Sequence, residues 1–257
     1  MKRKKDSGFM KQSVAKRLNS MLRVDFRRMF TSSMLYICLG CALVMPILVL
    51  VMTSGFGGED SLMFTNTWQI IASDGGAGMM DMTAMMNINL MYFLAGIFLC
   101  LFVGEDFKSG YAKNLFTVRP IKTDYVISKT LAGFTAGALM LIAFFIGAVF
   151  GGSFAGLPMS LGAAGVFGLV MCLLSKIALM FVFVAIFLLA SVFAKQRTWL
   201  SILLALFGGM LLFMMIPMLT PLNSGIGNLF MCLAGGVIFA AGIGVGSNVV
   251  LKKTSLV

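Results

Sequence analysis

The run "LAGFTAGALMLIAFFIGAVF", residues 131–150, contains twenty residues and no charged side chain. An α-helix rises about 1.5 Å per residue and the hydrocarbon core of a bilayer is about 30 Å thick, so about 20 apolar residues cross it. Five more apolar runs lie along the chain, and none alternates apolar and polar residues as strands of a membrane barrel do. The sequence therefore predicts an all-α integral membrane protein with six transmembrane helices: Met34–Met52, Asn87–Val103, Leu131–Phe150, Gly165–Phe193, Trp199–Ile216 and Leu229–Val250.

The composition indicates the same class. Hydrophobic residues make up 60% of the chain and charged residues 11%, whereas an average soluble domain is about 25% charged. The chain contains no histidine, and no acidic residue lies well inside an expected span. An intramembrane enzyme needs a convergent set of such side chains. We therefore expect no catalytic residue and no bound metal.

The distribution of basic residues predicts the orientation. Ten of the 20 Lys and Arg lie in the first 28 residues and five lie in residues 104–129, whereas the loop 53–86 contains only acidic charges. Because basic loops stay on the cytoplasmic side, both termini and residues 104–130 are expected to be cytoplasmic, and residues 53–86 to be outside. The bases are spread over short membrane-flanking loops, so the net charge of +11 indicates topology and not a nucleic-acid partner.

These assignments divide the chain into three parts. Residues 1–33 form a cytoplasmic basic segment, residues 34–250 form the six-span domain, and residues 251–257 form a cytoplasmic tail. On a helix, the first segment places an apolar stripe opposite a basic face, which predicts an interfacial amphipathic helix with its bases toward anionic lipid headgroups. The stripe contains Val14, Leu18, Met21, Leu22 and Met29, and the basic face contains Lys16, Arg23 and Arg27.

The acidic loop 53–86 is expected to pack as a cap over the outer mouth of the bundle. Its aromatic and aliphatic residues Trp68 and Ile70–Ile71 are expected to lie on the membrane surface, where amphipathic rings are enriched.

The longest polar segment in the middle of the chain is "GEDFKSGYAKNLFTVRPIKTDYVISK", residues 104–129, with three acids and five bases. Gly104 is expected to end the second span, and Asp106–Val118 to form a short helix on the membrane surface. Arg119–Pro120 ends this helix, because the residue before a proline is disfavoured in α geometry. A second helix is expected to run through Lys129 into the third span. Two short helices with a break between them suit docking to a soluble partner.

The chain resembles the ABC-2 type permeases, the membrane subunits of ATP-binding-cassette exporters. Members carry an acid at the end of span two, then a glycine, an aliphatic stretch, a proline, and a lysine at the start of span three. This chain has Glu105, Gly110, Leu115–Phe116, Pro120 and Lys129 in that order. Its six spans, N-terminal helix and length are also similar to the family, so the resemblance covers essentially the whole chain.

The sequence departs from the family pattern just after the proline, where Ile121 and Lys122 replace the usual polar residue and arginine. The resemblance implies a dimer of permeases, identical or related, on two ATPase subunits that bind ATP and Mg²⁺, in a bacterial cell membrane. The chain itself has no G-x-x-x-x-G-K-[ST] motif, so we expect no nucleotide or other cofactor on it. The resemblance assigns ATPase coupling to Glu105, Asp106, Gly110, Arg119, Pro120 and Lys129.

The resemblance also implies export of an amphipathic or lipophilic molecule, such as a peptide antibiotic, a drug or a lipid. Two other classes remain open. One is an ion-coupled carrier or channel, and the other is a membrane sensor or assembly component built on the same fold. Co-purification with an ATPase distinguishes the exporter from both.

Lys176 is the only charged residue deep inside an expected span. It lies about 16 Å from the outer end of its helix at about 1.5 Å per residue. Three positions remain open for its amine: a wet cavity where it meets substrate or a lipid phosphate, backbone carbonyls near Ser175, or the outer interface, reached by snorkelling. We expect the cavity.

Overall fold

The computed structural model describes residues 14–55, 64–72, 86–118, 122–162, 165–195, 197–213 and 215–253. All regular structure in these ranges is helical: α1 (Val14–Thr31), α2 (Ser33–Gly55), η1 (Thr67–Ile70), α4 (Leu90–Lys108), α5 (Tyr111–Val118), α6 (Lys122–Ala155), α7 (Gly165–Ala194), α8 (Thr198–Phe213), α9 (Ile216–Leu219) and α10 (Ile226–Lys253). The prediction of an all-α fold is confirmed for these residues.

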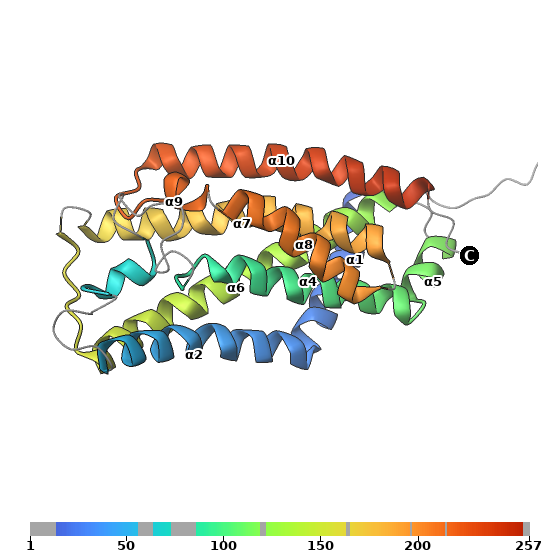
Figure 1. Ribbon diagram of the computed structural model, residues 1–257. Helices are drawn as coiled ribbons and strands as arrows, with labels where there is room; N and C mark the ends of the chain where they lie inside the picture. Colours follow the sequence, from blue (N-terminus) through green and yellow to red (C-terminus); the bar gives the residue numbers. More distant parts are fainter. Residues whose placement is uncertain are drawn as a thin grey trace, which may run out of the picture.

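The long helices form one bundle in which consecutive helices run in opposite directions (Figure 1). The most extensive contacts join α2 to α6 and α7 to α10. Helix α5 lies at one end of the bundle, and η1 and α9 lie at the other (Figure 1). These two ends are called the α5 end and the η1 end below.

Five described helices are long and apolar enough to cross a membrane: α2, α4, α6, α7 and α10. The expected fifth span, residues 199–216, is divided, because α8 ends at Phe213 and the short α9 follows with Pro217 in its first turn. At about 1.5 Å per residue, the 16 residues of α8 extend about 24 Å, less than the hydrocarbon thickness. The count of six spans stays a prediction.

The second span is longer than expected. Gly104 lies inside α4, which continues to Lys108, and the break before α5 falls at Ser109 and Gly110. The expectation that Gly104 ends the helix was wrong, because a single glycine inside an apolar, packed helix does not stop it. The second helix of the polar segment was predicted correctly: α6 begins at Lys122 and is continuous through Lys129 to Ala155.

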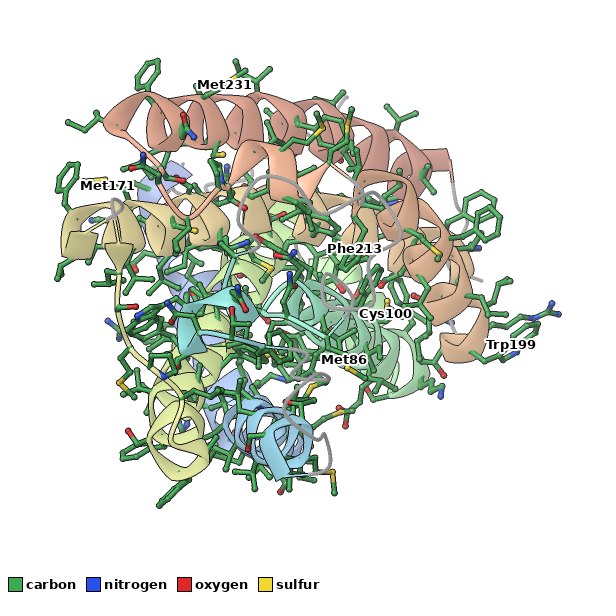
Figure 2. The ribbon with its side chains drawn as sticks, turned by 60° about the vertical axis from the view of Figure 1, so that its left-hand side comes forward. Met86, Cys100, Met171, Trp199, Phe213 and Met231 are labelled. Carbon is green, nitrogen blue, oxygen red and sulfur yellow. The ribbon has the colours of Figure 1, made fainter. Side chains whose placement is uncertain are left out.

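The outside of the bundle is apolar, as a surrounding of lipid requires. Trp199 on α8 and Met231 on α10 point outward, whereas Cys100 and Phe213 lie toward the middle (Figure 2). Helix α10 is the most exposed of the five candidate spans.

The expectation for the 53–86 loop was wrong in one respect. Trp68, Ile70 and Ile71 are buried at the η1 end and do not lie on the surface. The Trp68 indole Nε1 donates a hydrogen bond to the Met159 carbonyl at 2.9 Å, and the Thr67 amide donates to the Pro158 carbonyl at 3.2 Å. These bonds dock η1 onto the segment that follows α6, so the apolar side chains of η1 are covered by protein.

Candidate functional site

Three helices meet near the α5 end and place four charged residues together. Met21, Asp25 and Met29 recur at every fourth residue of α1, and all three are buried. This spacing puts them on one helix face, and that face packs against α6. The charged residues of the site are Asp25 and Arg28 from α1, Asp106 from α4 and Lys129 from α6, and we call them the ion cluster.

The geometry of the ion cluster is close and continuous. The Lys129 Nζ lies 2.9 Å from the Asp25 Oδ1 and 2.8 Å from the Asp106 Oδ2, and all three side chains are fully buried. The Arg28 guanidinium lies 2.7 Å from the Asp106 Oδ1. Two acids therefore balance two bases, and Asp106 sits between two cations.

Polar and aromatic side chains complete the surroundings. The Ser128 hydroxyl donates to the Asp25 Oδ2 at 2.5 Å, and the Tyr125 hydroxyl donates to the Asp106 Oδ2 at 3.0 Å. The Lys129 Nζ also lies 4.0 Å from the centre of the Phe102 ring. Buried charges are costly unless they are paired and hydrogen-bonded, and Asp25 and Lys129 meet both conditions, whereas the Arg28–Asp106 contact is an ion pair without a well-directed hydrogen bond.

The ion cluster reaches helix α5 through Arg28. Its guanidinium carbon lies 4.3 Å from the centre of the Tyr111 ring, which is the first residue of α5. Burial lowers the pKa of Arg28, but the neighbouring Asp106 carboxylate raises it, and the result lies above the ordinary value for arginine. Burial, followed by the charge of Asp25, raises the pKa of the Tyr111 hydroxyl. At neutral pH a charged guanidinium therefore stacks on a neutral phenol.

A second contact fixes α5 against α6. The Phe116 ring meets the Tyr125 ring edge-on, with the ring centres 5.3 Å apart. Since Tyr125 also binds Asp106, α5 is joined to the ion cluster at both its first turn and its last.

The structure brings together two of the residues predicted for coupling, Asp106 and Lys129. Glu105 is exposed and points away from the cluster, although it is adjacent to Asp106 in sequence. Gly110 has a φ of +73°, a region that L side chains rarely adopt, and a Cβ added there would contact nothing within 4 Å. The turn between α4 and α5 therefore explains why a glycine occupies position 110. Arg119 and Pro120 lie outside the described residues.

Sequence reasoning missed Asp25 and Arg28. A signal was present, because Asp25 is the only acid in α1 and falls on the same face as Met21 and Met29. An acid in an apolar stripe indicates a buried partner. The stripe was assigned to lipid, and this was wrong for Met21 and Met29, which are buried against the bundle. The bases Arg23 and Arg27 are exposed on the other side.

Lys176 lies in the half of α7 nearer the η1 end and is only 1% exposed. Its Nζ donates to the Asn89 Oδ1 at 2.8 Å and to the Thr220 Oγ1 at 2.9 Å. The amine is thus held by two neutral side-chain oxygens inside the bundle and does not snorkel to a surface.

Comparison with known protein families identifies the family of the chain. Residues 22–212 match the family model described as ABC-2 family transporter protein, which is well over half of the 257 residues. The matched range contains all four residues of the ion cluster and Lys176. Comparisons with curated proteins and with solved structures give no significant match.

Proposed function

The chain belongs to the ABC-2 family of transporter proteins, and from this premise we propose that it is the permease subunit of an ATP-driven exporter in a bacterial cell membrane. Permeases of this family work with an ABC ATPase. In the proposed assembly two ATPase subunits hold ATP and Mg²⁺, and this chain forms the membrane pathway with an identical or related permease. The α5 end and both termini face the cytoplasm, as the distribution of basic residues predicts.

The observation that carries the proposal is the ion cluster beneath α5. Helix α5 contacts it through Tyr111 and through Phe116, which packs on Tyr125 of α6, and the cluster joins α1, α4 and α6 by charged contacts. Hydrogen bonds to charged groups are about twice as strong as neutral ones, so these helices move as a unit at this point. A force on α5 is therefore passed to the spans and is not absorbed locally.

The surface available to an ATPase is polar. Helix α5 exposes Lys113, Asn114 and Thr117, and the last turn of α4 exposes Glu105. Arginine and acidic residues on a partner suit such a surface. We propose that Glu105 meets a base of the ATPase, and that the turn at Gly110 sets the direction in which α5 projects.

The proposed substrate class, amphipathic or lipophilic molecules, is supported by a groove between α2 and α4. The groove has a volume of about 640 Å³ and is lined by apolar side chains, among them Val44, Leu48, Phe93 and Ile97. Gly40 contributes to its wall, and a Cβ added at Gly40 would meet nothing within 4 Å. An apolar groove on a membrane helix pair suits a hydrocarbon chain and rejects charged groups.

Filling this groove tests the substrate class. Gly40→Leu is expected to leave assembly intact and to reduce export of lipophilic substrates severalfold, because a Cβ at this position meets nothing within 4 Å and the side chain extends into the groove. The control is Gly242→Leu on α10, where an added Cβ also meets nothing within 4 Å. Export is measured with a panel of lipophilic and polar compounds in cells. Equal export by both variants would exclude the groove from the pathway.

Lys176 is proposed to contact the substrate when the pathway is open. It is a cation at membrane depth, held by neutral oxygens that an anionic group can replace. Lys176→Met is then expected to change export and substrate-stimulated ATP hydrolysis without changing assembly.

The function as a whole is tested by purification of the tagged full-length chain from its native membrane. We expect an ABC ATPase to copurify and to show vanadate-sensitive ATP hydrolysis that lipophilic substrates stimulate. Substrate export that continues when ATP is depleted but stops when the ion gradient is collapsed would instead establish an ion-coupled carrier. An associated ATPase with no measurable transport would favour a sensor or assembly component.

A further inference from the structure

Lys176 joins three segments that are far apart in sequence. Its Nζ binds Asn89, which immediately precedes α4, and Thr220, which immediately follows α9. The Tyr92 hydroxyl of α4 returns a hydrogen bond to the Lys176 carbonyl at 2.8 Å. The start of α4 is therefore joined to α7 twice, and the end of α9 is joined to α7 by the same Lys176 amine.

The two partners of the amine are themselves held in position. The Asn87 Oδ1 accepts a hydrogen bond from the Asn89 amide at 2.9 Å, and both asparagines are buried. The Thr220 hydroxyl donates to the Ile216 carbonyl at 2.9 Å, so its oxygen is oriented to accept from Lys176.

Two cysteines, one on α7 and one on α10, contact the end of α9. The Cys172 Sγ of α7 lies 3.5 Å from the Thr220 carbonyl oxygen, and the Cys232 Sγ of α10 lies 3.9 Å from the Leu219 carbonyl oxygen. Thiols are weak donors. The strong contacts at this point are thus those of Lys176.

The charges at the two ends of the bundle differ in kind. The acidic residues that the structure describes, Asp25, Glu105, Asp106 and Asp124, all belong to helices at the α5 end. The ion cluster there pairs opposite charges, whereas Lys176 is paired with neutral oxygens. The Lys176 contacts lack the opposite charge whose Coulomb attraction holds each pair of the ion cluster together, so they are the ones that can open and close.

We propose that Lys176, Asn89 and Thr220 form a polar clasp that keeps the η1 end of the bundle closed in the resting transporter. The role in transport rests on the proposed function: motion from the α5 end opens the clasp, α9 moves away from α4, and the Lys176 amine becomes available to an anionic group. The closed state itself needs neither ATP nor substrate.

The buried thiol of Cys172 reports on this closure directly. Cys172 is 0% exposed and contacts the same Thr220 that the clasp holds. In the full-length chain in membranes, with the other four cysteines replaced by alanine, the rate of Cys172 labelling by a membrane-impermeant methanethiosulfonate is measured without ATP. Labelling is expected to be slow in the parent. It should be on the order of tenfold faster in Lys176→Met, Asn89→Leu and Thr220→Val, since each removes a hydrogen bond to a charged group.

Two controls separate a local opening from a general loss of structure. Thr135→Val removes a hydroxyl that binds only the Leu131 carbonyl of its own helix, and should leave Cys172 labelling unchanged. The clasp variants are also made with Cys100 as the single cysteine. Cys100 is equally buried but lies outside the clasp, and its labelling should stay slow.

An unchanged rate of Cys172 labelling in the three variants would overturn the proposal. Equal acceleration of labelling at Cys172 and at Cys100 would also overturn it. If Lys176→Met alone altered export while resting labelling stayed slow in all variants, Lys176 would be a substrate contact and not a clasp. Because labelling is measured without ATP or substrate, the clasp can fail this test while the proposed function still holds.

Discussion

At the scale of single residues, the ion cluster shows which sites a sequence reveals and which it conceals. Asp106 and Lys129 were singled out by the family resemblance as coupling residues, but their contact with each other was not predicted. Asp25 was not predicted, although it is bonded to Ser128 and Lys129, because these partners are 103 and 104 residues away in sequence. Helical periodicity indicates which residues share a face, but not which distant helix that face meets.

Removal of the central cation is the sharpest test of the ion cluster. Lys129→Met is expected to lower the stability of the chain by about 3–5 kcal/mol, because it leaves two buried carboxylates without their common partner. The measurement is thermal unfolding of the purified protein in detergent. The control is Lys113→Met on the exposed face of α5, which should change stability by less than about 0.5 kcal/mol. Similar melting of the two variants would show that the cluster contributes nothing measurable.

At the scale of elements, helix boundaries were predicted correctly where single residues determine them locally. The predictions were wrong where tertiary packing determines the boundary. A helix running through Lys129 into the third span was predicted correctly, and α6 begins at Lys122 and continues to Ala155. The division of residues 199–216 into α8 and α9 was not predicted, because the run is apolar throughout and only the backbone break before Pro217 marks it. The buried position of Trp68 likewise depends on a carbonyl 91 residues away.

Helices α2 and α6 pack closely at Gly147. A Cβ added at Gly147 would lie 2.1 Å from the Leu43 carbonyl oxygen and 2.8 Å from the Pro46 ring. Gly147→Val is therefore expected to separate the two helices and to destabilise the bundle by about 1–3 kcal/mol. The measurement is again thermal unfolding in detergent, together with the yield in the membrane. Gly242→Val, at a position where an added Cβ meets nothing within 4 Å, should behave like the parent, and equal loss in both variants would contradict the packing argument.

At the scale of the whole molecule, the two ends of the bundle differ in chemistry. The α5 end contains the ion cluster and the exposed polar helix, and the η1 end contains the buried aromatic segment and the neutral partners of Lys176. The family was predicted from motif spacing and architecture, and the family model confirms it. The orientation of the bundle stays a prediction from the basic residues alone.

That orientation is tested with single cysteines at opposite ends. Ser109 and Ser160 are both exposed, and they lie at the α5 end and the η1 end respectively. In intact cells a membrane-impermeant thiol reagent is expected to label Ser160→Cys and to leave Ser109→Cys unlabelled until the cells are permeabilised. The reverse pattern would invert the topology and remove α5 from the cytoplasm.

The pairing of Asp25 with Lys129 also determines the order in which the helices assemble. Helix α1 leaves the ribosome first, but the lysine that neutralises Asp25 is synthesised 104 residues later. At about 5–20 residues per second, α1 waits roughly 5–20 s for its partner. During this interval its charged residues must remain hydrated at the membrane surface. Helix α1 therefore docks only after α6 has been inserted, and the N-terminal segment of the chain is among the last to reach its final position.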